Sequence, residues 1–224
     1  MTFLSRFEAV LFDLNGTLAV DFDRFGGHQD YYDTYSRLGG TQLSPAAVDQ
    51  AVETSLGRCL QRYDEGPWDP FPEFGEFLRV DDPDEQLLLE DTVAEHELGW
   101  VSEERLTWLT HLAGTHQLGL VSDVWAPSRR LRAYLGTSKL ADLLDAIVIS
   151  SDVGAVKPSG RVFGLALRQM RTDPRSVVFI GDNYHRDVEG AAACGMATVW
   201  VSEERNVPGS VVPDRIVARV EELF

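Results

Sequence analysis

Short apolar runs recur along the chain and alternate with longer stretches that have a helical pattern of hydrophobic and polar positions. The apolar runs are rich in Val, Ile and Phe and show little alternation with polar residues, which is typical of strands covered on both faces. We expect five such strands: Ala9–Leu14, Leu118–Ser122, Ala146–Ser150, Val177–Gly181 and Ala197–Val201.

Helical patterns lie between most of these predicted strands. They cover Glu103–Ala113, Ser128–Leu135, Lys139–Leu144, Val162–Arg171, Asp187–Ala193 and, at the end of the sequence, Arg215–Leu223. Because strands and helices alternate, the pattern predicts an α/β fold with a Rossmann-like, mostly parallel sheet and helices on both faces.

The stretch Ala19–Gly99 departs from this alternation. It is rich in acidic and aromatic residues, and no strand is expected in it. Helices are expected over Pro45–Tyr63 and Pro83–Leu98, each preceded by a residue that can cap a helix N-terminus. The sequence therefore predicts an inserted all-helical cap domain at residues 19–99 and a core domain formed by residues 1–18 and 100–224.

Charge and cysteine usage restrict the partners and the compartment. The 224 residues include 36 acidic and 20 basic side chains, for a net charge of −16. Such a chain repels nucleic acid and anionic membranes, so neither is expected as a partner, and an anionic substrate would require local positive charge or a bound cation. The two cysteines lack a metal-ligand spacing, and no apolar run approaches the length of a membrane span. We therefore expect a cytoplasmic protein.

Chemically active side chains follow the predicted strands. Asp13 ends the first strand, Ser122 and Asp123 end the second, Lys157 lies in the loop after the third, and Asp182 follows the fourth. Ligands of open α/β sheets bind beyond the carboxyl ends of the strands, so these side chains are expected at one edge. This convergence is stronger evidence of a functional site than any single residue is, because each residue alone has an ordinary structural role.

Those ordinary roles apply to several of these residues. Asp13 would cap a turn at Asn15-Gly16, although a carboxylate at a buried strand end is costly unless it is paired or binds a metal. Asp187 would cap the following helix. The backbone N–H groups of Gly16 and Thr17 would face an anion as in a nest.

Four segments resemble the motifs of the haloacid dehalogenase superfamily, in their order. They are VLFDLNGTL, LGLVSD, VGAVKPSGRVFGLAL and VVFIGDNYHRDVEGAAACGM. The resemblance runs from Phe7 to about Val201, apart from the insert. The insert itself resembles the helical cap of the phosphoglycolate phosphatase and dehalogenase-like branch.

The resemblance implies a phosphatase that works in two steps. Asp13 would attack phosphorus, and water would cleave the aspartyl-phosphate. Mg²⁺ would be held by Asp13, Asp182 and the backbone carbonyl of Asn15, while Asp187 would support the metal shell or orient Lys157. The phosphate group would be bound by Gly16, Thr17, Ser122, Asp123 and Lys157.

Position 15 departs from the pattern of the family. Family phosphatases usually carry a second Asp there, which protonates the leaving oxygen and then activates water, whereas this chain has Asn15. An amide neither gives nor takes that proton, and losing a general acid–base typically costs ~10²–10⁴-fold in rate. The carbonyl contact with the metal is unaffected.

Three interpretations of Asn15 remain open. In the first, water, a cap residue such as His28 or a good leaving group replaces the missing acid. In the second, the protein is a 2-haloacid dehalogenase, although its fourth motif is of the metal-binding type. In the third, it is a weakly active or inactive relative that binds phosphorylated ligands or partner proteins. The first is preferred, with a small phosphorylated metabolite as the substrate and Arg24 and His28 of the early cap segment contacting it.

Overall fold

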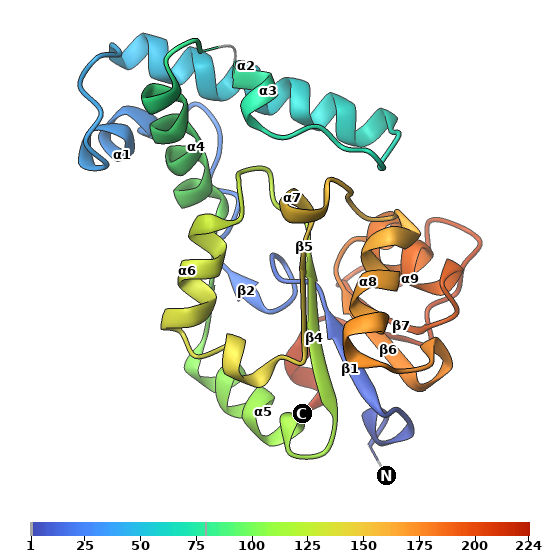
Figure 1. The fold of residues 1–224 in the computed structure, drawn as a ribbon. Helices are drawn as coiled ribbons and strands as arrows, with labels where there is room; N and C mark the ends of the chain where they lie inside the picture. Colours follow the sequence, from blue (N-terminus) through green and yellow to red (C-terminus); the bar gives the residue numbers. More distant parts are fainter. Residues whose placement is uncertain (1, 79) are drawn as a thin grey trace.

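The computed structural model describes residues 2–78 and 80–224 and is built around a parallel sheet (Figure 1). Its strands are β1 (Ala9–Phe12), β4 (Gln117–Ser122), β5 (Ala146–Ile149), β6 (Val177–Gly181), β7 (Ala197–Val201) and β8 (Arg215–Val217). Their order is β5-β4-β1-β6-β7-β8, and every neighbouring pair is parallel. The predicted α/β class with a mostly parallel sheet is confirmed.

β1 lies in the middle of the sheet, and its register sets the level of the neighbouring strand ends. Phe12 pairs with Leu120 of β4 on one side and with Ile180 of β6 on the other. The residues that follow these partners therefore leave the sheet at nearly the same level. Asp13 and Asp182 are thereby placed on adjacent strand ends, at the edge where ligands of open sheets bind.

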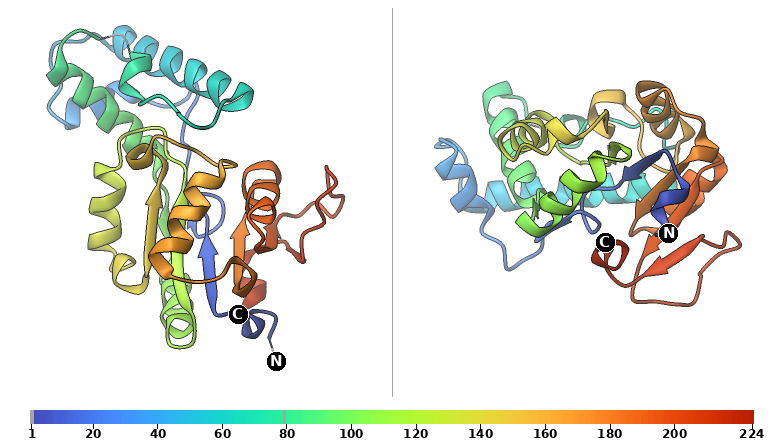
Figure 2. Two further views of the ribbon diagram at one scale, coloured as in Figure 1. Left: turned by 45° about the vertical axis from the view of Figure 1, so that its right-hand side comes forward. Right: turned by 90° about the horizontal axis from the view of Figure 1, so that it is seen from below.

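Helices cover both faces of the sheet (Figure 2). In the core they are η1 (Leu4–Arg6), α5 (Glu103–Ala113), α6 (Arg129–Thr137), η2 (Ala141–Leu143), α7 (Ser150–Val153), α8 (Gly160–Met170), η3 (Pro174–Ser176), η4 (Tyr184–Glu189), α9 (Gly190–Ala193) and η5 (Val220–Leu223). Val10 and Phe12 pack in an apolar cluster with α5 and α6. Ala9 and Leu11 pack in a second cluster with α8, because successive side chains of a strand point to opposite faces. Among the described residues, no helix has the length and apolar character that crossing a bilayer requires.

The end of the sequence differs from its prediction. A helix was expected over Arg215–Leu223, but the structure has the edge strand β8 followed by the short helix η5. Val217 pairs with Val201 of β7, so this segment with β-branched residues forms a strand by hydrogen bonding to the edge of the sheet. The predicted helix Lys139–Leu144 is reduced to one 3₁₀ turn, and the predicted helix Asp187–Ala193 begins earlier, as the π-helix η4.

Four helices form a layer beyond the carboxyl ends of the strands, at the top of Figure 1. They are α1 (Tyr31–Arg37), α2 (Pro45–Glu65), α3 (Gly75–Leu78) and α4 (Pro83–Glu97). This layer has its own apolar cluster, which includes Tyr31, Tyr35, Val52 and Leu89. Helices α1 and α3 were not predicted, because both are short.

The chain enters and leaves this helical layer through a small antiparallel sheet. β2 (Ala19–Val20) pairs with β3 (Trp100–Val101). The expectation of no strand within residues 19–99 is therefore wrong at β2, a two-residue strand that exists only through pairing with a distant segment. We propose that the helical layer is a cap domain joined to the core by this pair.

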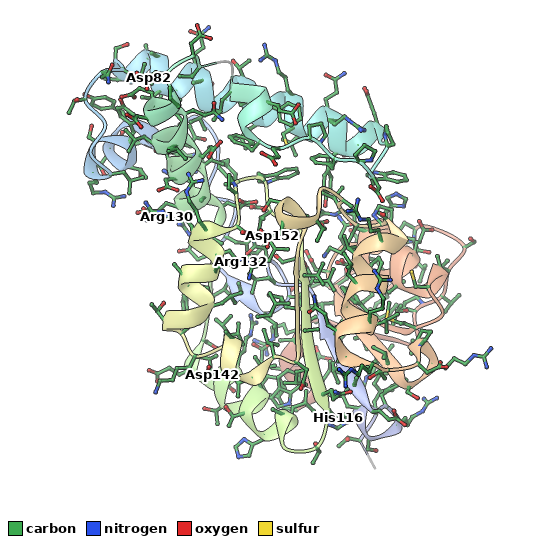
Figure 3. The ribbon with its side chains drawn as sticks, in the orientation of Figure 1. Asp82, His116, Arg130, Arg132, Asp142 and Asp152 are labelled. Atoms are coloured by element: carbon green, nitrogen blue, oxygen red, sulfur yellow. The ribbon has the colours of Figure 1, made fainter. Side chains whose placement is uncertain are left out.

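Ion pairs also join the cap to the core between α4 and α6. Arg129 and Arg130 of α6 bind Asp91 of α4, at 2.6 and 2.9 Å, and Arg129 also reaches Glu90 at 2.9 Å. Figure 3 shows Arg130 at the end of α6 that faces α4. Arg129, Arg130 and Asp91 are partly exposed whereas Glu90 is buried, so solvent weakens the pairs with Asp91 more than the pair with Glu90.

Candidate active site

A buried lysine joins two carboxylates at the edge of the sheet. Lys157 Nζ lies 2.6 Å from Asp13 Oδ1 and 2.7 Å from Asp187 Oδ1, and the lysine side chain is only 2% exposed. Burial alone would lower the pKa of Lys157, but the charges of Asp13, Asp187 and Asp123 outweigh it and raise that pKa above its ordinary value. The structure thus brings three predicted site residues, distant in sequence, into direct contact.

Asp182 lies beside this group. Burial and the nearby negative charges of Asp13 and Asp187 raise the pKa of Asp182 to about 8. A Cβ atom at Gly16 would stand 2.4 Å from Asp182 Oδ2, so the glycine makes the close approach of this carboxylate to the β1 loop possible. Trp200 Nε1 donates to the backbone oxygen of Asp182 at 2.8 Å and holds the loop.

The carboxylates have the arrangement that a hard divalent cation requires. Asp13, Asp182 and Asp187 can each offer an oxygen, and these oxygens lie within 4.8 Å of one another. Mutual repulsion disfavours ionisation of Asp182, and a divalent cation would remove this penalty. Both oxygens of Asp187 already accept hydrogen bonds, from Lys157 Nζ and from the N–H of Asn183 at 2.9 Å. The residues fit a cation, with Asp187 the least free of the three.

The carboxylate of Asp123 is occupied by protein groups. Its Oδ1 accepts from the N–H of Lys157 at 3.1 Å, and its Oδ2 accepts from the hydroxyl of Tyr63 on α2. Arg186 Nη1 donates to the same hydroxyl at 2.6 Å, and its guanidinium lies 4.8 Å from the centre of the Tyr63 ring. Asp123 therefore links cap and core, and its carboxylate is not available for the predicted phosphate contact.

Two buried hydroxyls, one after β1 and one at the end of β4, have no partner among the described residues. Ser122 Oγ and Thr17 Oγ1 are buried and make no hydrogen bond to any residue that the structure describes. Buried polar atoms are rarely left unpaired, so both hydroxyls are candidates for contact with a ligand. The N–H of Thr17 already donates to the carbonyl of Leu14 at 3.3 Å, so it is not free for the anion nest expected there.

Asn15 is turned toward the cap. Its Nδ2 donates to the backbone oxygen of Glu97, at the end of α4, at 3.3 Å. The carboxylate of Glu97 is buried and accepts from the N–H groups of Trp125 and Ala126. Burial raises the pKa of Glu97 well above its ordinary value. The hydrogen bonds from these two N–H groups oppose the rise, because they favour the charged form.

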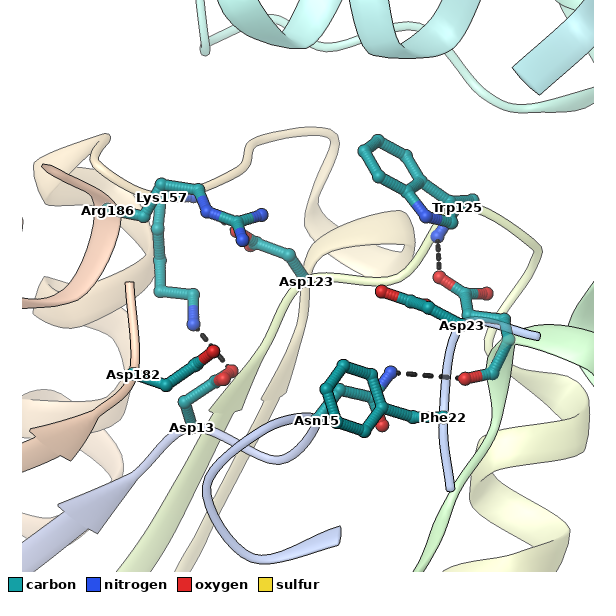
Figure 4. A pocket seen from close by; sticks show the side chains of 10 residues that line it. Asp13, Asn15, Phe22, Asp23, Asp123, Trp125, Lys157, Asp182 and Arg186 are labelled. Atoms are coloured by element: carbon teal, nitrogen blue, oxygen red, sulfur yellow. Dashed lines mark hydrogen bonds and ion pairs between the residues drawn. The ribbon is translucent and has the colours of Figure 1, made fainter. Parts of the chain in front are cut away.

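Several of these groups line a cavity of about 60 Å³ between cap and core (Figure 4), whereas Thr17, Ser122 and Asp187 are not part of its lining. Its lining residues are Asp13, Asn15, Phe22, Asp23, Glu97, Asp123, Trp125, Lys157, Asp182 and Arg186. A larger cavity of about 350 Å³ shares Asp23, Trp125 and Arg186 with it and is lined further by Tyr63 and Trp68. The sequence pattern did not indicate Glu97 or Arg186, because both reach the cavity through contacts between distant segments.

The two predicted substrate contacts of the early cap segment are not brought to the cavity. Arg24 donates to the backbone oxygen of Leu98 at 3.0 Å and to those of Asp21 and Glu95. Its guanidinium thus fastens the loop to the end of α4. His28 is exposed and lines neither cavity. Nothing in the sequence distinguished this anchoring role of Arg24 from substrate binding.

Comparison with known families and proteins identifies the family of the chain. The model of the haloacid dehalogenase-like hydrolases matches residues 7–195. The chain is 31% identical over 117 residues to pyrimidine 5'-nucleotidase YjjG of Escherichia coli (strain K12), which is 51% of each chain. It is 35% identical over 86 residues to phosphoserine phosphatase of Thermus thermophilus, covering 38% of this chain and 34% of that one. The matched segment spans about half or less of the length of these curated relatives.

Solved structures match over nearly the whole chain. A phosphatase of the same superfamily from Thermococcus onnurineus is 28% identical, has a TM-score of 0.62, and is matched over 96% of this chain and 95% of its own. A 2-haloacid dehalogenase from Pseudomonas syringae pv. tomato DC3000 is 22% identical, with a TM-score of 0.66 and coverage of 97% and 96%. At that identity, the second match shows a shared fold alone.

Proposed function

We propose that this chain, which belongs to the haloacid dehalogenase-like hydrolases, hydrolyses a small phosphomonoester through an aspartyl-phosphate on Asp13. The observation that carries the proposal is the buried contact of Lys157 with Asp13 and Asp187 beside Asp182. Phosphoryl transfer asks mainly for alignment and neutralisation of charge, and this group of residues provides both.

Asp13 is positioned as the nucleophile by the end of β1 and by Lys157. The lysine holds Oδ1 at 2.6 Å, which leaves Oδ2 to approach phosphorus. The ammonium also faces the cavity, where it would neutralise a phosphoryl oxygen. The hydroxyls of Ser122 and Thr17, which lack partners among the described residues, would donate to the other oxygens. Because the net charge of the chain is −16 and carboxylates outnumber Lys157 and Arg186 around the cavity, an anion would need the added charge of a cation to bind there.

Mg²⁺ would be held by Asp13, Asp182 and the backbone carbonyl of Asn15. Asp187 would support that shell or, as its two hydrogen bonds favour, orient Lys157. When bound, the ion would supply positive charge to the phosphoryl group during its transfer. The raised pKa of Asp182 supports this assignment, since carboxylates crowded together in this way are disfavoured unless a cation joins them.

The names of the relatives support a phosphorylated small molecule as the substrate. They include a nucleotidase, a phosphoserine phosphatase and glyceraldehyde 3-phosphate phosphatases. The larger cavity, with Tyr63, Trp68 and Trp125 in its wall, would receive the part of the substrate beyond the phosphate.

Release of phosphate from a panel of phosphomonoesters, in Mg²⁺ and in EDTA, tests the proposal. We expect Mg²⁺-dependent turnover that falls to background in Asp13→Asn. Asp142→Asn is a matched control, because Asp142 is exposed in η2 and does not line the cavity (Figure 3). Turnover that persists in Asp13→Asn would remove Asp13 as the nucleophile.

Asn15 favours a second candidate function, in which the site binds a phosphorylated ligand without turning it over. Thermal unfolding in the presence of Mg²⁺ and each panel compound distinguishes the two functions. A ligand at 100 times its dissociation constant adds ~2.7 kcal/mol to stability. A compound that stabilises the protein but is not hydrolysed would support binding alone. Chloride release from 2-haloacids without metal would instead indicate a dehalogenase.

A further inference from the structure

Asn15 leaves the proposed phosphatase without its usual proton donor, and the inference drawn here rests on that proposed function. The Asn15 amide has no proton to give at neutral pH. Its Nδ2 is bound to the backbone oxygen of Glu97 at 3.3 Å, so the side chain is held toward the cap. Another group in the cavity must protonate the leaving oxygen of an alkyl phosphate.

The cavity contains few free carboxyl groups. Asp13 is bound to Lys157, and Asp182 belongs to the proposed cation site. Both oxygens of Asp123 accept hydrogen bonds, and so do both oxygens of Glu97. Asp23 differs from all of these, because within residues 2–78 and 80–224 its carboxylate makes no hydrogen bond or ion pair.

The backbone around Asp23 is held in place beside Asn15. The N–H of Asp23 donates to the backbone oxygen of Glu97 at 3.1 Å, and this same oxygen accepts from Asn15 Nδ2. Residues whose donors share one oxygen are necessarily neighbours. Asp23 also has a φ of +50°, a conformation that is uncommon for non-glycine residues but that aspartate and asparagine adopt more readily than most. Figure 4 shows its carboxylate turned into the cavity above Asn15.

We propose that Asp23 is the general acid and base of this site and does the work of the carboxyl group that position 15 lacks. In the first step, Asp13 bonds to phosphorus and the bond to the leaving oxygen breaks. The proton of the Asp23 carboxyl group passes to that oxygen and gives the free alcohol. In the second step, water bonds to phosphorus, its proton returns to Asp23, and the bond to Asp13 breaks to release phosphate.

The charged surroundings of Asp23 suit both steps. Partial burial of the carboxylate away from water raises the pKa of Asp23 to about 6, although the side chain stays open to the cavity. Arg186 opposes this rise and Asp13 adds to it. The other titratable groups around the cavities that Asp23 lines are Tyr63, Asp64, Glu97, Asp123, Lys157, Asp182 and His185. A pKa near the working pH makes a group able to give and to take a proton.

Asp21 provides a matched control for Asp23. It lies in the same loop, has a similar φ of +55°, and is exposed. Its carboxylate lies 3.8 Å from Arg24 Nη1 and does not line the cavity. Asparagine tolerates this backbone conformation well, so Asp21→Asn and Asp23→Asn are both expected to fold.

The dependence on the leaving group tests the proposal. For an alkyl phosphate, whose leaving oxygen needs a proton, Asp23→Asn should lower kcat/KM by ~10²–10⁴-fold, and Asp21→Asn should leave it unchanged. For p-nitrophenyl phosphate, whose phenolate leaves unassisted, the loss in Asp23→Asn should be much smaller. An equal loss for both substrates, or no loss for the alkyl phosphate, would overturn the role of Asp23.

Restoring the carboxyl group at position 15 provides the second test. In the Asp23→Asn background, Asn15→Asp should recover most of the alkyl phosphatase activity, whereas in the wild type it should add little. A large gain in the wild type would show that no acid is present there and would overturn the proposal. Turnover of the aryl phosphate by the wild type, and its loss in an Asp13 variant, tests the proposed function separately. If the wild type does not hydrolyse the aryl phosphate, the proposed function and this inference are both overturned.

Discussion

Replacing Lys157 by methionine tests the electrostatic design of the site in isolation from turnover. The substitution keeps most of the volume of the side chain and its packing on Phe179, whose ring centre lies 5.7 Å from Nζ. It removes the ammonium that lies 2.6 Å from Asp13 and 2.7 Å from Asp187. The buried carboxylates of Asp13 and Asp187 then lie close to each other and to Asp182 without the positive charge that compensates them.

The expected cost follows from the burial of this group. Lys157 is 2% exposed, and the Asp13 and Asp187 side chains are 10% and 1% exposed, so solvent screens their charges little. Removing one partner of a buried ion pair costs about 3–5 kcal/mol, because the remaining charge is left uncompensated. Domains are stable by roughly 5–15 kcal/mol, so Lys157→Met should lose a large fraction of the free energy of unfolding.

Urea unfolding at neutral pH in EDTA measures this loss. Adding Asp187→Asn to Lys157→Met should recover part of it, because one uncompensated charge is removed. Arg161→Met is the control, since Arg161 pairs with Asp69 at 3.0 Å but the two side chains are 49% and 36% exposed. That variant should lose ~1 kcal/mol or less. A loss in Lys157→Met no greater than in Arg161→Met would refute this account of the buried pairs.

Two further predictions concern the cap and its contact with the core. Burial lowers the pKa of His96, which bonds to Thr34 Oγ1 and the Arg24 carbonyl at 3.0 Å, so the folded protein takes up this proton at a lower pH than the unfolded chain does. Stability should therefore fall as the pH drops below ~6.5, where the unfolded chain gains the proton, and urea unfolding of His96→Gln should show a weaker fall. Tyr63→Phe removes the hydroxyl between Asp123 and Arg186 and should cost ~1–3 kcal/mol by urea unfolding, because it leaves a buried carboxylate short of a donor. A Tyr63→Phe variant as stable as the wild type would contradict that network.

The sheet and the edge that carries the candidate site were predictable because both depend on local pattern. Uninterrupted apolar runs identified β1, β4, β5, β6 and β7, and parallel strands in register place their following residues at one edge. Asp13, Lys157 and Asp182 could therefore be assigned together. The edge strand β8 could not, since its segment is short and becomes a strand only by pairing with β7.

The cap side of the cavity could not be predicted from the sequence, because contacts between distant segments create it. Asp23 reaches the cavity because its loop is bound to the end of α4, both through its own N–H and through the guanidinium of Arg24. Tyr63 and Arg186 meet only because α2 lies over η4. No spacing or periodicity in the sequence indicates such contacts.

Reductive trapping of the protein during turnover tests the central claim most directly. Borohydride reduces an acyl phosphate to an alcohol, so mass spectrometry of the peptide that contains Asp13 reports the intermediate. We expect the reduced side chain at Asp13 when substrate and Mg²⁺ are both present, and its absence when either is omitted. Rapid turnover with Asp13 unmodified, under conditions that reduce a model acyl phosphate completely, would contradict catalysis through this carboxylate.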